Sequence, residues 1–314
     1  MKLPPKLTYF LVRPVVLLFE WLPLAVGVML GRALGALFYC ADGRHRRITL
    51  ENLQRALGKE RSSAEIRRIA RRTYRNLGAS VAEIMKIGRL SAGRVKKWVA
   101  LEGIEHYTEA RAKGKGALFL SAHFGNWELL PIAFGVLVHR IVGVARPLDN
   151  PYLDELVRGT RERWGNQILS KRGAVREAMR LLSEGQSVGF LLDQNVSGRG
   201  GVFVPFFDQP ASTNKSLALI ALRTGAPVIP VFLVRDKGGH RIRVEKEVEL
   251  YRSGDLEADI LENTARFTQM IESQIRRHPD QWLWMHRRWK TQPPAGARPA
   301  RRLDAARKPD RNAL

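Results

Sequence analysis

The 314-residue sequence contains one cysteine, Cys40, which excludes a disulfide framework or a cysteine-built zinc site within one chain. Acidic residues are also scarce. Against 53 Lys and Arg there are only 30 Asp and Glu, so the formal net charge is +23 and the pI is about 10.9. Nucleic acid, an anionic membrane surface or an acidic protein would each fit this charge. The His, Cys and carboxylate residues lack metal-ligand spacing, and we predict neither a metal nor a cofactor.

Long uncharged apolar runs are missing as well. Residues 7–41 are strongly apolar, but no uncharged stretch reaches the roughly 18 residues of a simple spanning helix. The interrupting charges are Arg13, Glu20 and Arg32. A helix that lies in the membrane or enters it obliquely therefore fits at least as well as a clean span. Pro14 and Pro23 should bend or divide it.

We expect residues 1–43 to form an N-terminal membrane-associated helical segment, although a buried helical hairpin of a soluble protein remains the alternative. Basic residues follow directly and suit the headgroups on the cytoplasmic face of a cell inner membrane. They are Arg44, Arg46 and Arg47. Residues 44–290 would then be the main domain, and residues 291–314, rich in Pro, Ala and Arg, a disordered basic tail.

The main domain begins with a helical, basic region over residues 44–97. Ser62 and Glu65 have the spacing of a capping box, and apolar residues recur after them at helical intervals. Five arginines occupy the rest of this helix: Arg67, Arg68, Arg71, Arg72 and Arg75. They form either a solvated face or a surface for phosphates or a membrane.

Between residues 101 and 243 the pattern changes to strands that alternate with helices. Strands are predicted at 117–122, 140–145, 187–193 and 227–235, and helices at 127–138, 150–164, 174–183 and 214–224. Alternation of this kind predicts an α/β fold with a mainly parallel or mixed central sheet flanked by helices. Residues 241–250 resemble an edge strand, and residues 256–277 a long amphipathic helix.

His123 and Glu128 are the strongest candidates for chemistry. On one regular helix, side chains five residues apart diverge by roughly 140° and could not act together. They converge if His123 ends the strand and Glu128 opens the helix, with Gly125 allowing the turn and Asn126 able to cap. Glu128 would then orient His123 as a general base. A surface histidine beside a capping glutamate is the plain alternative.

Two further positions end predicted strands, where open α/β sheets usually bind ligands. Arg146 could bind a phosphate or stabilise an oxyanion, or else form a structural salt bridge. Asp193 and Gln194 could orient a substrate, or else shape the following turn. Tryptophans near the C-terminus lie among basic residues, which suggests a membrane-interface belt or a surface that stacks nucleic-acid bases. They are Trp282, Trp284 and Trp289.

The block His123-Phe-Gly-Asn-Trp-Glu128 resembles the His-x4-acid motif of the lysophospholipid acyltransferase superfamily. Glutamate in place of aspartate is typical of one branch, the late lauroyl/myristoyl acyltransferases of lipid A biosynthesis. Five further segments match that branch: Arg146–Pro151, Gly189–Asn195, Val204–Phe207, Pro227–Pro230 and Pro279–Lys290. The resemblance extends from the N-terminal apolar helix to about residue 290.

This resemblance implies an acyltransferase that moves an acyl chain from an acyl thioester, usually on acyl carrier protein, to a hydroxyl of a phosphorylated lipid A precursor. His123 would be the general base and Glu128 its orienting partner, with Asn126, Arg146, Asp193 and Gln194 nearby for substrate. Another glycolipid or lysophospholipid acceptor with acyl-CoA as donor remains open, as does a scaffold that has lost activity. A basic nucleic-acid-binding protein would explain the charge but not the apolar N-terminus, so we expect no nucleic acid.

Overall fold

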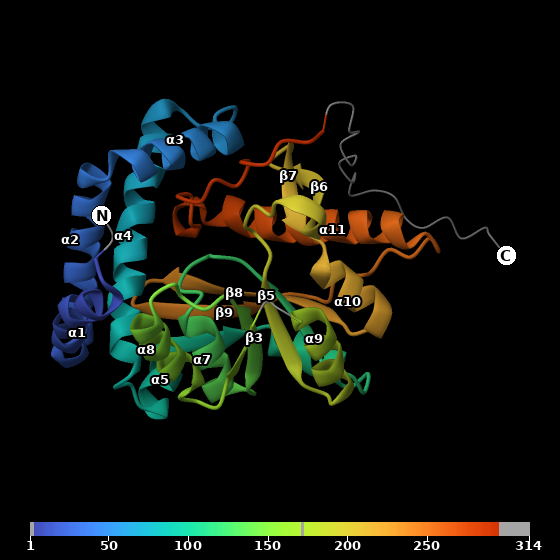
Figure 1. Cartoon of the computed structure of the whole chain (residues 1–314), viewed down its shortest axis with the longest axis horizontal. Helices are drawn as coiled ribbons and strands as arrows, with labels where there is room; N and C mark the ends of the chain where they lie inside the picture. Colours follow the sequence, from blue (N-terminus) through green and yellow to red (C-terminus); the bar gives the residue numbers. More distant parts are fainter. Residues whose placement is uncertain (1–2, 171–172, 295–314) are drawn as a thin grey trace.

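The N-terminal third of the chain is helical. The computed structural model describes residues 3–170 and 173–294, and Figure 1 shows its elements. The helices are α1 (Pro5–Trp21), α2 (Leu24–Ala41), α3 (Gly43–Leu57), α4 (Ser63–Ile87) and α5 (Ala92–Trp98). Pro23 separates α1 from α2, whereas α1 continues through Pro14. The capping box of Ser62 and Glu65 is present at the start of α4, which confirms that prediction.

A seven-stranded sheet in the order β1-β9-β8-β2-β5-β3-β4 forms the centre of the chain. Its strands are β1 (Val99–Glu102), β2 (Leu118–Ser121), β3 (Ile141–Ala145), β4 (Gln167–Ser170), β5 (Ser187–Leu191), β8 (Val228–Asp236) and β9 (Gly239–Val244). Every pairing is parallel except that between β8 and β9. The predicted α/β fold with a mainly parallel or mixed sheet is confirmed.

Helices cover both faces of this sheet. They are α6 (Ile104–Arg111), α7 (Leu129–Leu137), α8 (Pro151–Glu162), α9 (Ala174–Ser183), α10 (Ser216–Thr224) and α11 (Leu256–Arg277). Successive residues of β2 face opposite sides, as strand geometry requires. Leu118 and Leu120 join a core cluster with α9, α10 and α11, while Phe119 joins a second cluster with α5, α6 and α7.

Two expectations about the later elements were wrong. The strand predicted at 241–250 is not at the edge, because β9 lies between β8 and β1. The C-terminal tryptophans do not form a belt, since Trp282, Trp284 and Trp289 are 1%, 0% and 5% exposed and belong to the core. Trp282 and Trp289 pack there with Phe206 of a hairpin, β6 (Gly201–Phe206) and β7 (Gln209–Asn214). Short 3₁₀ turns at Gly198–Gly200 and Pro279–Gln281 complete the structure.

Helices α1, α2 and α4 lie side by side at one end of the molecule (Figure 1). The buried residues of α2 are all glycines, namely Gly27, Gly31 and Gly35. A Cβ on Gly31 would lie 2.4 Å from the carbonyl oxygen of Gly78 on α4, so only glycine permits this approach. Among the described residues, α2 is the one helix whose length and mean hydropathy of 1.7 would allow it to cross a membrane.

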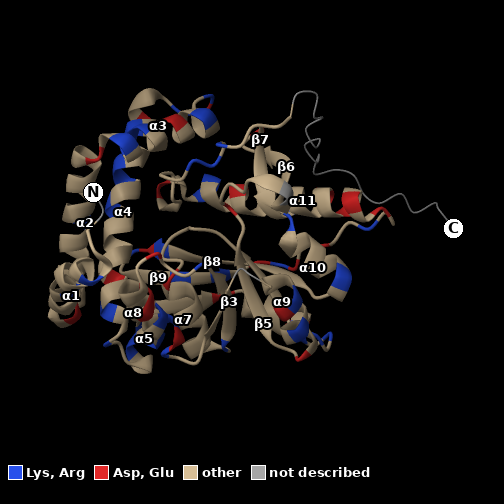
Figure 2. Cartoon of the chain, in the orientation of Figure 1, with Lys and Arg blue, Asp and Glu red and all other residues tan. Residues whose placement is uncertain are grey.

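The outward faces of α1 and α2 are apolar. Their exposed side chains include Phe10, Leu18, Trp21, Met29, Leu34 and Leu37. Basic residues adjoin this face along α3 and α4, as Figure 2 shows in blue. All five arginines singled out on α4, between Arg67 and Arg75, are exposed. A large exposed apolar surface beside basic residues is typical of proteins that contact a membrane.

Candidate active site

His123 follows β2 at the carboxyl end of the sheet, as predicted. The turn after it depends on Gly125, which has φ +58° and lies so close to the Leu233 carbonyl that a Cβ would be 1.8 Å from the oxygen. The C-terminal segment holds this turn from the other side. The N–H of Leu283 donates to the His123 carbonyl at 3.0 Å, and the N–H of Gly125 donates to the Gln281 carbonyl at 2.8 Å.

The hydrogen-bond partner of the His123 ring is Asp193, not Glu128. Nδ1 of His123 lies 2.8 Å from Oδ1 of Asp193, which follows the neighbouring strand β5. Oδ2 of the same carboxylate accepts from the backbone N–H of His123 at 2.9 Å and from the indole N–H of Trp282 at 2.7 Å. Because three donors converge on one buried side chain, the ring orientation is fixed.

Asp193 remains ionised despite its burial. Its side chain is only 2% exposed, and burial alone would raise the pKa. The charge and hydrogen bonds of His123, together with the Trp282 hydrogen bond, lower the pKa of Asp193 to about 2. An ionised carboxylate at Nδ1 favours the tautomer with its proton on Nδ1, which leaves Nε2 as the basic atom. The amide nitrogen of Gln194 lies 3.2 Å from Nε2, as expected for a donor to that lone pair.

Glu128 instead forms a two-pronged ion pair with Arg161 of α8. Its carboxylate oxygens accept from Nε of Arg161 at 2.7 Å and from Nη2 at 2.6 Å. We expected Glu128 to accept a hydrogen bond from one nitrogen of the His123 ring, and Asp193 occupies that place instead. The reason is geometric: Glu128 is the N-cap residue of α7 and its side chain reaches α8, whereas the β2–β5 pairing places Asp193 beside the histidine.

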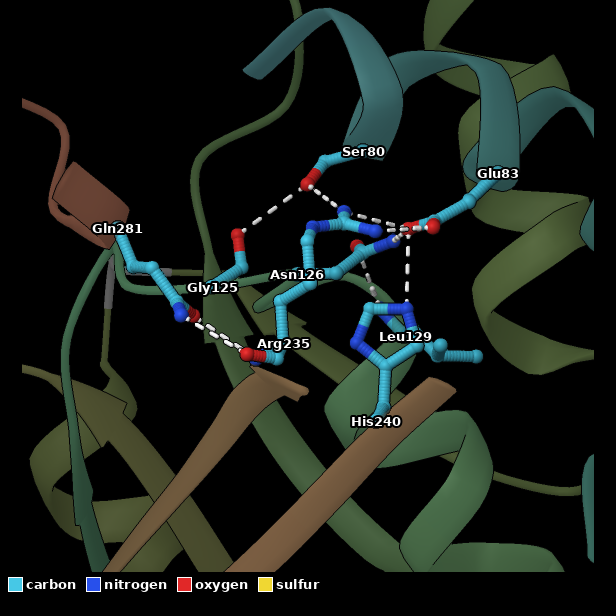
Figure 3. A network of polar contacts seen from close by, with 8 residues as sticks. All are labelled: Ser80, Glu83, Gly125, Asn126, Leu129, Arg235, His240 and Gln281. Atoms are coloured by element: carbon cyan, nitrogen blue, oxygen red, sulfur yellow. Dashed lines mark hydrogen bonds and ion pairs between the residues drawn. The ribbon is translucent and has the colours of Figure 1, made fainter. Parts of the chain in front are cut away.

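Asn126, which we expected to contact substrate, is fully buried, and its side chain holds the turn by hydrogen bonds. Its amide oxygen accepts from the N–H of Leu129, the first residue of α7, at 3.2 Å, and its amide nitrogen donates to Glu83 of α4 at 2.8 Å. Figure 3 shows that Glu83 is the centre of a polar network reaching both the turn and the sheet. The same carboxylate pairs with Arg235 of β8 and with Nε2 of His240 on β9.

Burial acts on both titratable partners in this network. It would raise the pKa of Glu83, but the hydrogen bonds from His240 and Arg235 lower it to about 2. Burial lowers the pKa of His240, so we take His240 as neutral with its proton on Nε2 facing Glu83. Arg235 also donates to Ser80, whose hydroxyl donates to the Gly125 carbonyl at 3.3 Å. The turn after His123 is thus tied to α4, the helix on which α2 packs.

An open cavity of about 570 Å³ lies in front of His123. Arg146 lines it at the end of β3, with a side chain that is 73% exposed and paired with Asp149 at 2.9 Å. Gln194 lines it too, so these two predicted residues share the cavity with His123. Arg146 forms its salt bridge with the exposed Asp149 and not with Glu128 or Asp193, so its guanidinium remains accessible to an anionic group.

A second, mostly apolar cavity of about 100 Å³ adjoins the first. It lies between the sheet and α7, and its walls include Phe119, Leu130, Ile141, Gly143, Ile168 and Gly189. Trp127, Glu128 and Arg161 line both cavities. The Glu128–Arg161 ion pair therefore stands where the open polar cavity meets the apolar one.

Sequence analysis missed Arg161 and Glu83. Arg161 is one of many arginines in a basic chain, and no sequence pattern around it distinguishes it from the others. Glu83 does carry a signal, because it follows Ala79 and Ala82 on the buried face of an amphipathic helix where a carboxylate is uncommon.

A histidine held by a buried carboxylate, beside a mostly apolar cavity in an α/β sheet, is typical of enzymes that activate a hydroxyl or water. The chain belongs to the bacterial lipid A biosynthesis acyltransferase family, and the sequence model of that family matches residues 1–291. It is an acyltransferase of lipid A biosynthesis. Members of this family are associated with the bacterial inner membrane.

Three relatives illustrate the family. The lipid A biosynthesis palmitoleoyltransferase of Escherichia coli is 30% identical over 280 residues, which cover 88% of this chain and 89% of that protein. The lauroyltransferase of the same organism is 29% identical over 278 residues, or 87% of this chain and 88% of that protein. The myristoyltransferase of that organism is 22% identical over 259 residues, which cover 82% of this chain and 79% of that protein.

Proposed function

We propose that the enzyme transfers a fatty acyl chain from an acyl thioester, with acyl carrier protein as the expected carrier, to a hydroxyl of a phosphorylated lipid A precursor. His123 is the general base. As the hydroxyl oxygen attacks the thioester carbonyl, Nε2 of His123 takes its proton. The C–O bond of the new ester forms, the C–S bond breaks, and the proton passes to the departing thiolate. No covalent enzyme intermediate is needed.

The observation that carries this proposal is the hydrogen bond between His123 and the ionised, buried Asp193. The carboxylate holds the ring in the tautomer that leaves Nε2 basic and stabilises the imidazolium that forms during attack. Asp193 therefore takes the positioning role that the sequence motif assigns to Glu128. The Gln194 amide beside Nε2 marks where the acceptor hydroxyl enters.

The two adjoining cavities suit the two substrates. The apolar cavity takes the acyl chain, which places the thioester where that cavity meets the open one, near His123. Arg161 is the described cation that lines both cavities, and its guanidinium would stabilise charge on the thioester oxygen. Arg146, exposed in the open cavity, would bind a phosphate of the acceptor.

In this proposal the N-terminal helices would hold the site at a membrane. The exposed apolar faces of α1 and α2 would enter the lipid, and the basic residues of α3 and α4 would contact anionic headgroups at the cytoplasmic surface of the inner membrane. The acidic carrier protein would approach from the aqueous side, where the net charge of +23 favours its association.

The test is a transfer assay with purified protein, acyl carrier protein or CoA thioesters, and lipid A precursor, read by mass spectrometry of the product. His123→Ala should lower the rate at least about 10²-fold, since general base catalysis contributes 10²–10⁴-fold. His106→Ala on α6, outside both cavities, is the matched control and should retain activity. Full activity of the His123 variant would overturn the mechanism, and transfer to a lysophospholipid in preference to the lipid A precursor would overturn the acceptor.

A further inference from the structure

On the face of the central sheet that α7 covers, two neighbouring strands have glycine at the same level, so no side chains fill the space above them. Gly143 of β3 pairs in register with Gly189 of β5, and both line the apolar cavity. Their outer neighbours in the same row are Ile168 on β4 and Phe119 on β2. Strands are about 4.8 Å apart, so two adjacent glycines open roughly 10 Å of the floor beneath α7. The cavity lies over this gap.

The backbone does not require glycine at either position. Neither residue has a positive φ, so any side chain could adopt the conformation. A Cβ on Gly189 would meet its nearest neighbours, Phe119 Cβ and the Val142 carbonyl, at 4.0 Å, an ordinary contact. On Gly143 it would meet the flexible end of Ile168 at 3.3 Å. Glycine inside a strand is unfavourable without a local reason, and here the open cavity is the feature that two side chains would remove.

The position of the pair along the strands sets its depth in the cavity. Ser121 and Leu191 line the cavity at the carboxyl ends of β2 and β5, two residues nearer to His123. The glycines therefore lie roughly 7 Å deeper, at about 3.3 Å of rise per residue. Ile141, two residues before Gly143, lines the cavity deeper still. An apolar chain that enters beside His123 must cross the glycine pair to reach Ile141.

We propose that Gly143 and Gly189 set the length of acyl chain that the enzyme transfers, because they keep open the passage to the deep end of the cavity. This inference rests on the proposed function, in which the apolar cavity holds the acyl chain. A side chain at either position would end the passage at the level of the pair. Short chains would still fit, while longer chains would lose the contacts beyond it.

The experiment compares Gly189→Ala, Gly143→Ala, the double variant and Gly189→Leu across a series of saturated thioester donors from octanoyl to palmitoyl. In Gly189→Leu, the ratio of kcat/KM for the longest donor to that for the shortest should fall at least about 10-fold relative to the unsubstituted enzyme, since one methylene in a fitted pocket changes selectivity 10–200-fold. The alanine variants should shift the ratio in the same direction by smaller steps. Gly93→Ala on α5, where a Cβ meets nothing within 4 Å, is the control and should leave it unchanged.

One result would overturn this inference: an unchanged donor ratio in the folded Gly189→Leu and double variants, whether the rates stay the same or fall equally for all donors. The alanine variants keep the test decisive if leucine disturbs folding, because they add only one methyl group each. Failure of the proposed function looks different. In that case the unsubstituted enzyme would transfer no thioester chain, or would do so equally well without His123.

Discussion

Replacing Asp193 with asparagine tests how His123 is activated. Oδ1 of Asp193 accepts from Nδ1 of His123, and Oδ2 accepts from two N–H groups. An amide keeps only one oxygen. With its NH₂ facing the two N–H donors, it would lose two buried hydrogen bonds, at a cost of about 1–3 kcal/mol each. The favoured orientation therefore turns the NH₂ toward Nδ1, which moves the imidazole proton to Nε2.

A histidine with its proton on Nε2 cannot accept the acceptor's proton there. The equivalent exchange in a Ser-His-Asp triad lowers kcat about 10⁴-fold, which corresponds to about 5.5 kcal/mol of transition-state stabilisation. We expect Asp193→Asn to lower kcat by about 10³- to 10⁴-fold while KM for the thioester changes little, because Asp193 does not line the apolar cavity. Steady-state transfer assays with purified protein measure both constants.

The control is Asp236→Asn, the same chemical change on an exposed aspartate at the end of β8, paired on the surface with Arg241. It should keep kcat within about two-fold, since exposed ion pairs contribute about 0–1 kcal/mol. Retention of more than about one tenth of kcat by a folded Asp193→Asn protein would refute the assignment of the orienting role to Asp193.

Arg161→Lys should lower kcat at least about 10-fold, because lysine cannot replace the two-pronged pairing with Glu128, and transfer assays would detect the loss. Glu83→Gln should destabilise the fold by about 3–5 kcal/mol in denaturant titrations, since it leaves Arg235 buried without its counter-charge. In the unsubstituted protein, the lowered pKa of Glu83 contributes about 3 kcal/mol above pH 4.5, which is lost as the pH falls toward 2, so acid titration should show stability falling over this range. Gly31→Leu should separate α2 from α4, because a Cβ would lie 2.4 Å from the Gly78 carbonyl oxygen, and limited proteolysis should then cut between α1 and α3 faster than in the parent.

Sequence reasoning located the elements that have strong local signals. The apolar run before His123 and the Gly125 turn after it predicted β2 and α7, and the capping box predicted the start of α4. Residues 256–277 were predicted as one helix, which α11 confirms. The short strands β1 and β4 and the hairpin of β6 and β7 were not predicted, because four to six residues without a clear apolar period carry little local signal.

The partner of His123 could not be predicted for a different reason. Local sequence shows that Asp193 ends a strand, but it does not show which strands are neighbours. Pairing of β2 with β5 joins residues about 70 positions apart, and only that pairing decides between Asp193 and the nearer Glu128. The tryptophans were misassigned because aromatic residues among basic ones fit both an interface and a core, and burial distinguishes the two.

Three carboxylates surround the turn after β2, and their surroundings give each a separate task. Asp193 receives only N–H donors, including the histidine ring, so its negative charge acts on His123. Glu83 accepts hydrogen bonds from Arg235, His240 and Asn126, so its negative charge stabilises the network that holds the turn to α4. Glu128 is neutralised by Arg161 at the junction of the two cavities. In the mechanism that we propose, the spacing of His123 and Glu128 matters without direct contact between them: His123 lines the open cavity as the base, and Glu128 holds Arg161 where the two cavities meet.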